Sequence, residues 1–216
     1  MHWIDVSIPL RNGIVGWPGD VPVTVARRME IEQGAEYNIS MLTVSTHSGT
    51  HMDAPLHFIT GGEGIDALPL DVTIGPARVI EIADPEIVRA GELEKHDIRP
   101  GERILLKTVN SARRWPDLPF REGYVYISQG VASHLVERGV RCVGVDYISV
   151  GDTRMETSIP THRTLLAGGV WIIECLYLAD VPAGECELIC LPLRVEGAEG
   201  APARAIVGLP LDSARR

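Results

Sequence analysis

Three of the seven histidines in this 216-residue chain lie within the eleven positions from 47 to 57. His47, His51 and His57 share this segment with the carboxylate of Asp53. All spacings within the group are even, so an extended chain would present the four side chains on one face. Imidazole nitrogens and carboxylate oxygens are common ligands of divalent metals such as Zn²⁺. The segment therefore indicates a metal site, and a polar turn with solvated histidines is the alternative.

A straight strand could not bring these side chains into one site. Its rise of about 3.3 Å per residue would spread them over about 33 Å. The chain must therefore curl, and Gly49 and Pro55 are the residues whose backbone preferences best allow this. Three protein ligands on one short segment also leave coordination positions open, which is typical of a catalytic rather than a structural zinc site.

Three residues outside this segment are further candidates. Glu174 is the only charge in the apolar run 170–176, where a buried carboxylate needs a metal, a shared proton or an arginine. His162 follows Pro160 near the expected start of a helix, where a capping or surface role is the simpler explanation. Trp17 precedes a Pro-Gly turn, so it is either a core anchor or an aromatic wall over a pocket.

The elements that must position these residues are mostly strands. Helical patterns predict a helix from about Gln129 to Arg138 after a cap at Ser128, one that follows Thr161 and stops at Gly168, and one around 90–96. The pattern predicts a mixed α/β, strand-rich fold, and we expect residues 1–216 to form a single domain. Runs rich in Val and Ile predict strands at 3–8, 23–27, 38–46, 77–82, 103–108, 124–128, 141–146, 170–176, 187–191 and 203–207.

Composition and charge exclude several classes of protein. Twenty basic against twenty-nine acidic residues give a net charge of −9, which argues against nucleic-acid binding. The longest apolar run, 165–173, is far shorter than the roughly 20 residues of a membrane helix. No secretory signal is visible and the four cysteines form no C-x-x-C pair, so we expect a cytoplasmic protein with reduced thiols in its core.

The segment His47-Ser-Gly-Thr-His51-Met-Asp53-Ala-Pro55 resembles the H-x-G-T-H-x-D-x-P motif of the Putative cyclase family of metal-dependent hydrolases. That family includes bacterial arylformamidases (kynurenine formamidases), to which the chain is most similar, isatin hydrolases and proteins linked to polyketide cyclisation. The resemblance implies a swivelling β/β/α domain and a homo-oligomer, either a dimer or a tetramer. It extends through Trp3-Ile-Asp-Val-Ser-Ile-Pro-Leu, Trp17-Pro-Gly-Asp, Gly75-Pro-Ala-Arg, Cys186-Glu-Leu-Ile-Cys-Leu-Pro-Leu and Gly200-Ala-Pro-Ala-Arg.

In the formamidase branch the resemblance implies a site with two metal ions. By motif, His47, His51 and Asp53 would hold the first ion. Asp53 would bridge to a second ion held also by His162 and Glu174, with Glu174 touching both ions. The interval from His162 to Glu174 is similar to the formamidase arrangement, whereas isatin hydrolases lack a carboxylate at the latter position. Zn²⁺ is the expected metal, and Mn²⁺ is the alternative.

The resemblance also implies an activity, the hydrolysis of an amide bond. N-Formylkynurenine, a compound of tryptophan degradation, is the expected small-molecule substrate. His57 matches the proton shuttle and Trp17 matches the residue that stacks on the substrate. The stretch 146–151 lacks a proline that formamidases carry near 147–148, which leaves the substrate open. Two alternatives to the expected function remain. These are a related hydrolase of a cyclic amide or lactone, similar to isatin hydrolases, and a non-catalytic metal-binding protein.

Overall fold

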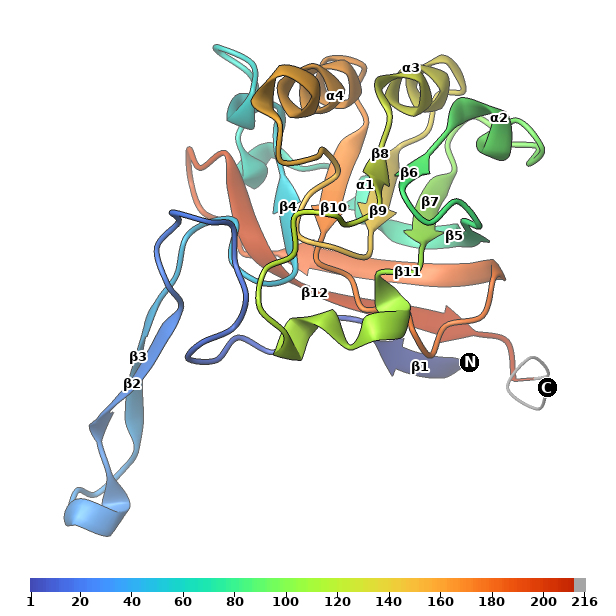
Figure 1. Cartoon of the computed structure of the whole chain (residues 1–216). Coiled ribbons are helices and arrows are strands. Elements are labelled where there is room, and N and C mark those ends of the chain that lie inside the picture. Colours follow the sequence, from blue (N-terminus) through green and yellow to red (C-terminus); the bar gives the residue numbers. More distant parts are fainter. Residues whose placement is uncertain (212–216) are drawn as a thin grey trace.

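The computed structural model describes residues 1–211, apart from the side chain of Arg113, and is mixed α/β and rich in strands, as predicted (Figure 1). Its main sheet has eight strands in the order β1-β12-β11-β5-β7-β9-β10-β4, and β4 also pairs with β12. The sheet therefore curves back on itself at β4. The strands are β1 (His2–Asp5), β2 (Thr24–Met29), β3 (Ile39–Thr43), β4 (His51–Asp53), β5 (Ile74–Glu81), β6 (Ile87–Val88), β7 (Arg103–Lys107), β8 (Tyr126–Ile127), β9 (Cys142–Val145), β10 (Trp171–Glu174), β11 (Gly184–Pro192) and β12 (Gly200–Leu209). The α-helices are α1 (Leu70–Thr73), α2 (Ala90–Leu93), α3 (Gln129–Glu137) and α4 (Met155–Ala167).

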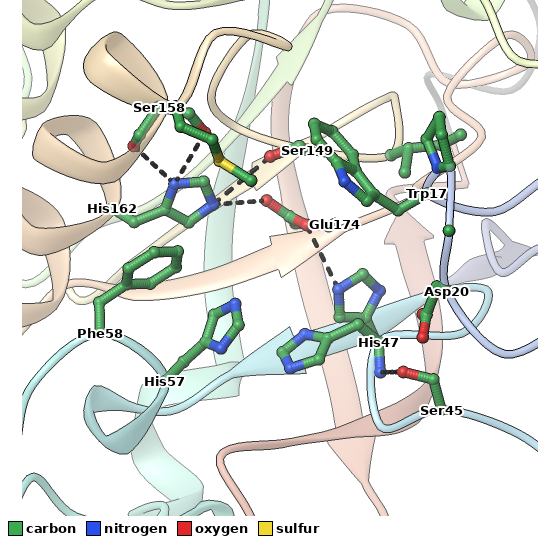
Figure 2. Close-up of a pocket in the computed structure, with 15 residues that line it drawn as sticks. Trp17, Asp20, Ser45, His47, His57, Phe58, Ser149, Ser158, His162 and Glu174 are labelled. Atoms are coloured by element: carbon green, nitrogen blue, oxygen red, sulfur yellow. Dashed lines mark hydrogen bonds and ion pairs between the residues drawn. The ribbon is translucent and has the colours of Figure 1, made fainter.

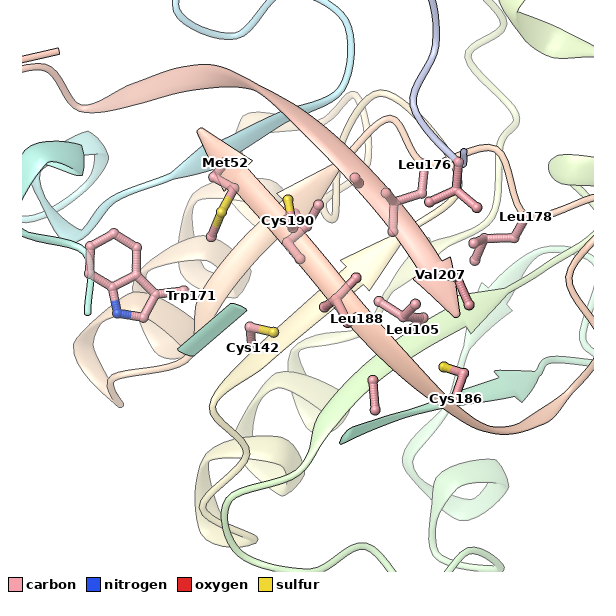
Figure 3. Packing of buried hydrophobic residues seen from close by; sticks show 14 of the residues in the cluster. Met52, Leu105, Cys142, Trp171, Leu176, Leu178, Cys186, Leu188, Cys190 and Val207 are labelled. Carbon is pink, nitrogen blue, oxygen red and sulfur yellow. The ribbon is translucent and has the colours of Figure 1, made fainter. Parts of the chain in front are cut away.

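The central strands β7, β9 and β10 are parallel and are buried on both faces. Successive residues of a strand point to opposite faces, so Cys142 packs toward β11 and β12, while Val143 packs toward the helices. The first of these two cores includes Met52, Leu188 and Val207 (Figure 3). Helices α3 and α4 cover the second core (Figure 1), which gives three layers in the order β/β/α. Burial on both faces explains why these strands read as continuous apolar runs.

Helix α3 begins and ends where the sequence predicts. The Ser128 side chain accepts a hydrogen bond from the backbone N–H of Val131, which satisfies one of the free donors at the helix start. After the helix, Gly139 has a φ of 68°, a left-handed conformation that favours glycine.

The helix predicted to follow Thr161 is wrong in its start. Helix α4 begins at Met155, and Pro160 lies inside it although proline usually marks the first turn of a helix. The lost backbone donor of Pro160 is tolerated because Leu165 and Leu166 anchor the helix in the core beneath it. As a result, His162 lies in the middle of α4 on its buried face, instead of in its first turn.

Two short strands were not among the predicted elements. Strand β4 has three residues and β6 has two, and such lengths are too short to show a periodic pattern. Both are held by their partners, β4 by β10 and β12, and β6 by β8. Strand β4 therefore depends on tertiary pairing rather than on local sequence preference.

The ends of β7 and β9 are tied together by the buried carboxylate of Asp146. Its Oδ2 accepts hydrogen bonds from the backbone N–H groups of Thr108 at 2.8 Å and Ser111 at 3.1 Å. Its Oδ1 accepts a third from the Thr108 hydroxyl at 2.8 Å. Burial raises the pKa of Asp146, and these hydrogen bonds oppose that effect. The network fixes the point at which the chain leaves β9 and enters the loop 147–151, next to Glu174 and His162.

Strands β2 and β3 form a hairpin that projects away from the rest of the molecule (Figure 1), and we call residues 24–43 the arm. All five residues of β3 are exposed. A two-stranded hairpin is marginally stable alone in water, and within residues 1–211 this one pairs with no third strand. Large apolar side chains are exposed along it, namely Met29, Ile31, Tyr37, Ile39, Met41 and Leu42.

The four cysteines have the character that the sequence predicts. All four cysteines are buried and free of disulfides. Burial raises the pKa of the thiols of Cys142 and Cys186 to about 12, so they behave as apolar core residues. No helix within residues 1–211 has the length and apolar character needed to cross a bilayer.

Candidate metal centre

Strand β4 places His51 and Asp53 on the same face, because they are two residues apart, while Met52 points into the apolar core. In the antiparallel pairing with β10, Glu174 is the direct partner of His51. Cross-strand partners have neighbouring side chains, and here Glu174 Oε2 lies 3.3 Å from His51 Nε2. The carboxylate of Glu174, the only charge in its apolar run, is thus directed at the predicted metal segment.

Both bends expected around the histidine segment occur. Gly49 has a φ of 65°, and a Cβ atom at this position would lie 2.6 Å from Leu10 Cδ2. The left-handed backbone conformation at this position therefore favours glycine. On the other side, a 3₁₀ turn at Pro55–His57 folds the chain back. The ring of His57 consequently stacks on that of His47, with centroids 4.1 Å apart.

His162 approaches the same site from α4 (Figure 2). Its Nδ1 donates to the backbone carbonyl of Ser158 at 2.8 Å, which leaves Nε2 as the acceptor. That Nε2 lies 3.4 Å from Glu174 Oε1 and 4.0 Å from Asp53 Oδ2. His51 is oriented in the same way, since its Nδ1 donates to the carbonyl of Gly49 at 2.8 Å. Two histidines thus offer Nε2 lone pairs to one place.

The side chains form two overlapping ligand groups. His47, His51 and Asp53 can bring ligand atoms within 4.8 Å of one another, and so can Asp53, His162 and Glu174. Asp53 belongs to both groups and is fully buried. The structure therefore brings together all five residues that the sequence proposes as metal ligands.

Several polar atoms of these groups are buried without a hydrogen-bond partner within residues 1–211. They are Nε2 of His47, Nε2 of His51 and Oδ2 of Asp53. Each unsatisfied buried polar atom costs about 1–3 kcal/mol, so such atoms are rare unless a ligand completes them. A divalent cation would satisfy Nε2 of His51 and Oδ2 of Asp53, and the ring of His47 lies beside them. The donor set of imidazole nitrogen and carboxylate oxygen therefore fits a metal ion.

Charges in the centre stabilise ionised carboxylates. Burial by itself would raise the pKa of Asp53, but the hydrogen bond to His47 and the nearby histidines hold it well below its usual range. Glu174 also has a lowered pKa, because contacts with His162 and His51 outweigh burial and the charge of Asp53. Burial opposes protonation of His47, yet Asp53, Glu174 and Glu199 raise its pKa to about 9. The two buried carboxylates are thus held in their ionised form, which suits them to bind cations.

The pKa of His57 is shifted in the opposite direction from that of His47. Burial lowers its pKa below the ordinary 6.5, and the charge of Asp53 offsets this only in part. The imidazole is therefore neutral at pH 7 and is able to accept a proton.

The centre lies at the base of a cavity of about 430 Å³. Trp17 and Phe58 line it together with Ile148 and Met155, and His57 faces into it (Figure 2). Trp17 reaches the cavity because its carbonyl accepts a hydrogen bond from Asp20 N–H at 3.1 Å, which closes the predicted turn. The cavity thus combines an aromatic wall with a polar base, as small-molecule sites do.

Sequence reasoning missed three residues of this site. Phe58 follows the last histidine of the segment and stands over His162, with ring centroids 4.5 Å apart. Ser149 lies in the loop after β9, 3.4 Å from His162 Nε2. Glu199 contacts His47 from the start of β12. The Glu199 position directly precedes the Gly-Ala-Pro-Ala-Arg motif, which was the one available signal for it.

Comparison with known proteins identifies relatives over nearly the whole chain. A family model described as "Putative cyclase" matches residues 4–152. A kynurenine formamidase of Bacillus thuringiensis (strain Al Hakam) is 38% identical over 208 residues, which cover 95% of this chain and 97% of that protein. One of Bacillus anthracis is 37% identical over 207 residues, with 95% and 96% covered.

Solved structures share the fold. One described as a potential metal-dependent hydrolase with cyclase activity superposes with a TM-score of 0.83 at 29% identity, covering 95% of this chain and 96% of that one. Isatin hydrolase A from Labrenzia aggregata superposes with a TM-score of 0.82 at 22% identity, with 95% and 93% covered. The fold and the ligand groups define a class, the β/β/α proteins with a histidine and carboxylate metal centre. The chain belongs to the Putative cyclase family.

Replacement of Glu174 by Gln should lower the metal content. The side chain faces both His51 and His162, and an amide would supply a weaker ligand without charge. We expect purified Glu174→Gln protein to retain less bound metal per chain than wild type. Elemental analysis after dialysis measures this. The exposed Glu196→Gln serves as the matched control, and an unchanged metal content in Glu174→Gln would contradict its role as a shared ligand.

Proposed function

We propose that this chain is a metal-dependent amidohydrolase that cleaves N-formylkynurenine to kynurenine and formate. The observation that carries the proposal is the pair of overlapping ligand groups sharing Asp53, at the base of a cavity with an aromatic wall. The identity of 38% to a kynurenine formamidase over 95% of the chain supports the same substrate. The hydrolase relatives support an enzyme rather than a non-catalytic metal-binding protein.

In this proposal the two ligand groups hold two zinc ions per chain, with Mn²⁺ as the alternative metal. His47, His51 and Asp53 would hold one ion, and Asp53, His162 and Glu174 the other. The chemistry supplied by such ions is Lewis acidity, which activates water at neutral pH and polarises an amide carbonyl. Ionised Asp53 and Glu174 keep the site negative enough to retain both ions.

His57 would move the proton in the reaction. Water adds to the formyl carbon, the bond between that carbon and the aryl nitrogen breaks, and the nitrogen must gain a proton as formate departs. His57 is neutral at pH 7, borders the cavity and stacks on His47, so it can take the proton from water and return it to the nitrogen. General acid–base catalysis of this kind contributes about 10²–10⁴-fold to a rate.

Trp17 would bind the aromatic ring of the substrate. Its indole lines the cavity and contacts Phe120 edge to face, with centroids 5.8 Å apart. That contact holds the indole in place, so a planar substrate ring can stack on it with little loss of side-chain freedom. Phe58 lies across the histidines from Trp17 and would limit the size of the acyl group (Figure 2).

A substrate panel tests the proposed reaction. We expect the zinc-loaded protein to hydrolyse N-formylkynurenine with a kcat/KM at least tenfold above that for isatin or simple lactones. The shared fold with isatin hydrolases favours cyclic amides as the second candidate, although at 22% identity it supports the fold alone. Faster turnover of isatin or a lactone would replace the proposed substrate with that candidate.

Replacement of His57 by Ala should separate proton transfer from metal binding. His57 is outside both ligand groups, so metal content should stay at the wild-type value while kcat falls by about 10²–10⁴-fold. Stopped assays with elemental analysis of the same samples provide both readings. His96→Ala, far from the centre in sequence and outside both ligand groups, is the control. A kcat near wild type in His57→Ala would rule out the shuttle.

We also propose that the protein is a homo-oligomer, a dimer or tetramer, in which a second copy covers the arm. Ile39 and Met41 are both exposed and share one face of β3. Apolar side chains in such number on a projecting hairpin are typical of an interface between subunits.

Lysine at two positions of the arm should weaken this assembly. The double variant Ile39→Lys, Met41→Lys would place charges in the apolar interface, so we expect a smaller species than wild type in sedimentation equilibrium at micromolar concentration. Leu70→Lys changes an exposed leucine outside the arm and should leave the mass unchanged. A monomeric wild-type protein at these concentrations would contradict the proposal.

Two further features complete the proposed description. Strands from both ends of the chain, β1 and β12, pair within one sheet, which supports a single domain over residues 1–216. Four buried free thiols support a reducing compartment, and we infer a cytoplasmic location.

A further inference from the structure

The three histidines of the ligand groups differ in the partner of their second ring nitrogen. His51 and His162 each donate Nδ1–H to a backbone carbonyl, that of Gly49 and that of Ser158. His47 has no such carbonyl. Its Nδ1 lies 3.0 Å from Asp53 Oδ1 and faces the ligand group, while its Nε2 lies 3.4 Å from the carboxylate of Glu199. The carboxylate of Glu199 therefore lies beside the second ring nitrogen of His47, as backbone carbonyls do for the other two histidines, but at a longer distance.

Several contacts hold the Glu199 carboxylate in this position. The Thr46 hydroxyl donates to Glu199 Oε1 at 2.6 Å. The backbone carbonyl of Glu199 accepts a hydrogen bond from Ala54 N–H at 2.9 Å, directly after the last residue of β4. The next residue, Gly200, pairs with Asp53 across the two strands. Glu199 is thus attached to the same strand that carries the shared ligand.

Gly200 makes room for this arrangement. A Cβ atom at this position would lie 2.8 Å from His47 Cε1 and 2.7 Å from the carbonyl oxygen of Met52. Any side chain would displace the His47 ring or the β4 backbone. The His47 ring is thus packed against the start of β12. Its Nε2 is buried and lacks a hydrogen-bond partner among residues 1–211, so this atom still needs an acceptor.

We propose that Glu199 is a positioning residue of the metal centre, whose carboxylate accepts the Nε2–H of His47 and directs Nδ1 of that ring toward the metal. A histidine ligand that donates its other N–H to a carboxylate has a fixed tautomer and orientation and is a stronger base. Thr46 acts through Glu199 by holding the carboxylate. This inference rests on the proposed role of His47 as a ligand.

Removal of the carboxylate should weaken metal binding. Loss of such an outer partner typically costs 10–100-fold in metal affinity. We expect Glu199→Ala to weaken Zn²⁺ binding by about this factor, measured by competition with a chromophoric chelator. Glu199→Gln keeps an acceptor oxygen and should recover part of the loss. Glu196→Ala, an exposed glutamate three residues away, should bind Zn²⁺ as the wild type does.

A spectroscopic reading separates positioning from a general structural effect. In Co²⁺-loaded protein, a turned His47 ring changes the ligand field, so Glu199→Ala should shift the visible absorption bands while Glu196→Ala should not. Thr46→Val should weaken Zn²⁺ binding less than Glu199→Ala does. In the double variant of both substitutions, the Zn²⁺ affinity should equal that of Glu199→Ala alone, because both residues act through one carboxylate. Urea unfolding of the metal-free variants checks that each is folded.

The outcomes distinguish this inference from the proposed function. A wild-type protein that binds neither Zn²⁺ nor Co²⁺ would contradict the metal centre itself. A wild type that binds both, with Glu199→Ala unchanged in affinity and spectrum, would overturn only the role of Glu199. The same conclusion follows if Glu199→Gln is no better than Glu199→Ala, or if the Thr46 and Glu199 effects are additive.

Discussion

The buried carboxylate of Asp53 is the group on which the rest of the centre depends. A carboxylate without solvent is costly unless cations or hydrogen-bond donors surround it. Here His47 bonds to it directly, and His51 and His162 lie within 4.0 Å. The same charge that makes this position unfavourable for an isolated aspartate makes it suited to two cations, because both ligand groups meet at this side chain.

Strand β4 can carry this residue because it is paired on both sides. Strand β10 supplies Glu174 opposite His51, and β12 supplies Gly200 opposite Asp53 with Glu199 beside it. Closing the sheet at β4 therefore brings side chains from three distant parts of the chain to one place. The parallel strands β9 and β10, buried on both faces, form the rigid base on which this depends.

The walls of the cavity over the centre come from loops and from helix α4 rather than from the sheet. The Trp17 turn, the 3₁₀ turn at Pro55–His57 and the loop 147–151 each contribute one wall. Because loops vary more freely than strands, the same sheet and ligands are compatible with several substrates. This division fits the fold that this chain shares with an isatin hydrolase at only 22% sequence identity.

The sequence by itself determined the chemical identity of the ligands, the mixed α/β class and the bends at Gly49 and Pro55, because these follow from residue type, short spacing and local backbone preference. It left Glu174 and His162 undecided, except through family resemblance. Only the tertiary structure decided how they meet Asp53, since β4 exists through its pairing and His162 faces inward through a helix that continues past Pro160. Glu199 has no local signature apart from its place just before the Gly-Ala-Pro-Ala-Arg motif. Its contact with His47 arises because β12, more than a hundred residues away in sequence, pairs with β4.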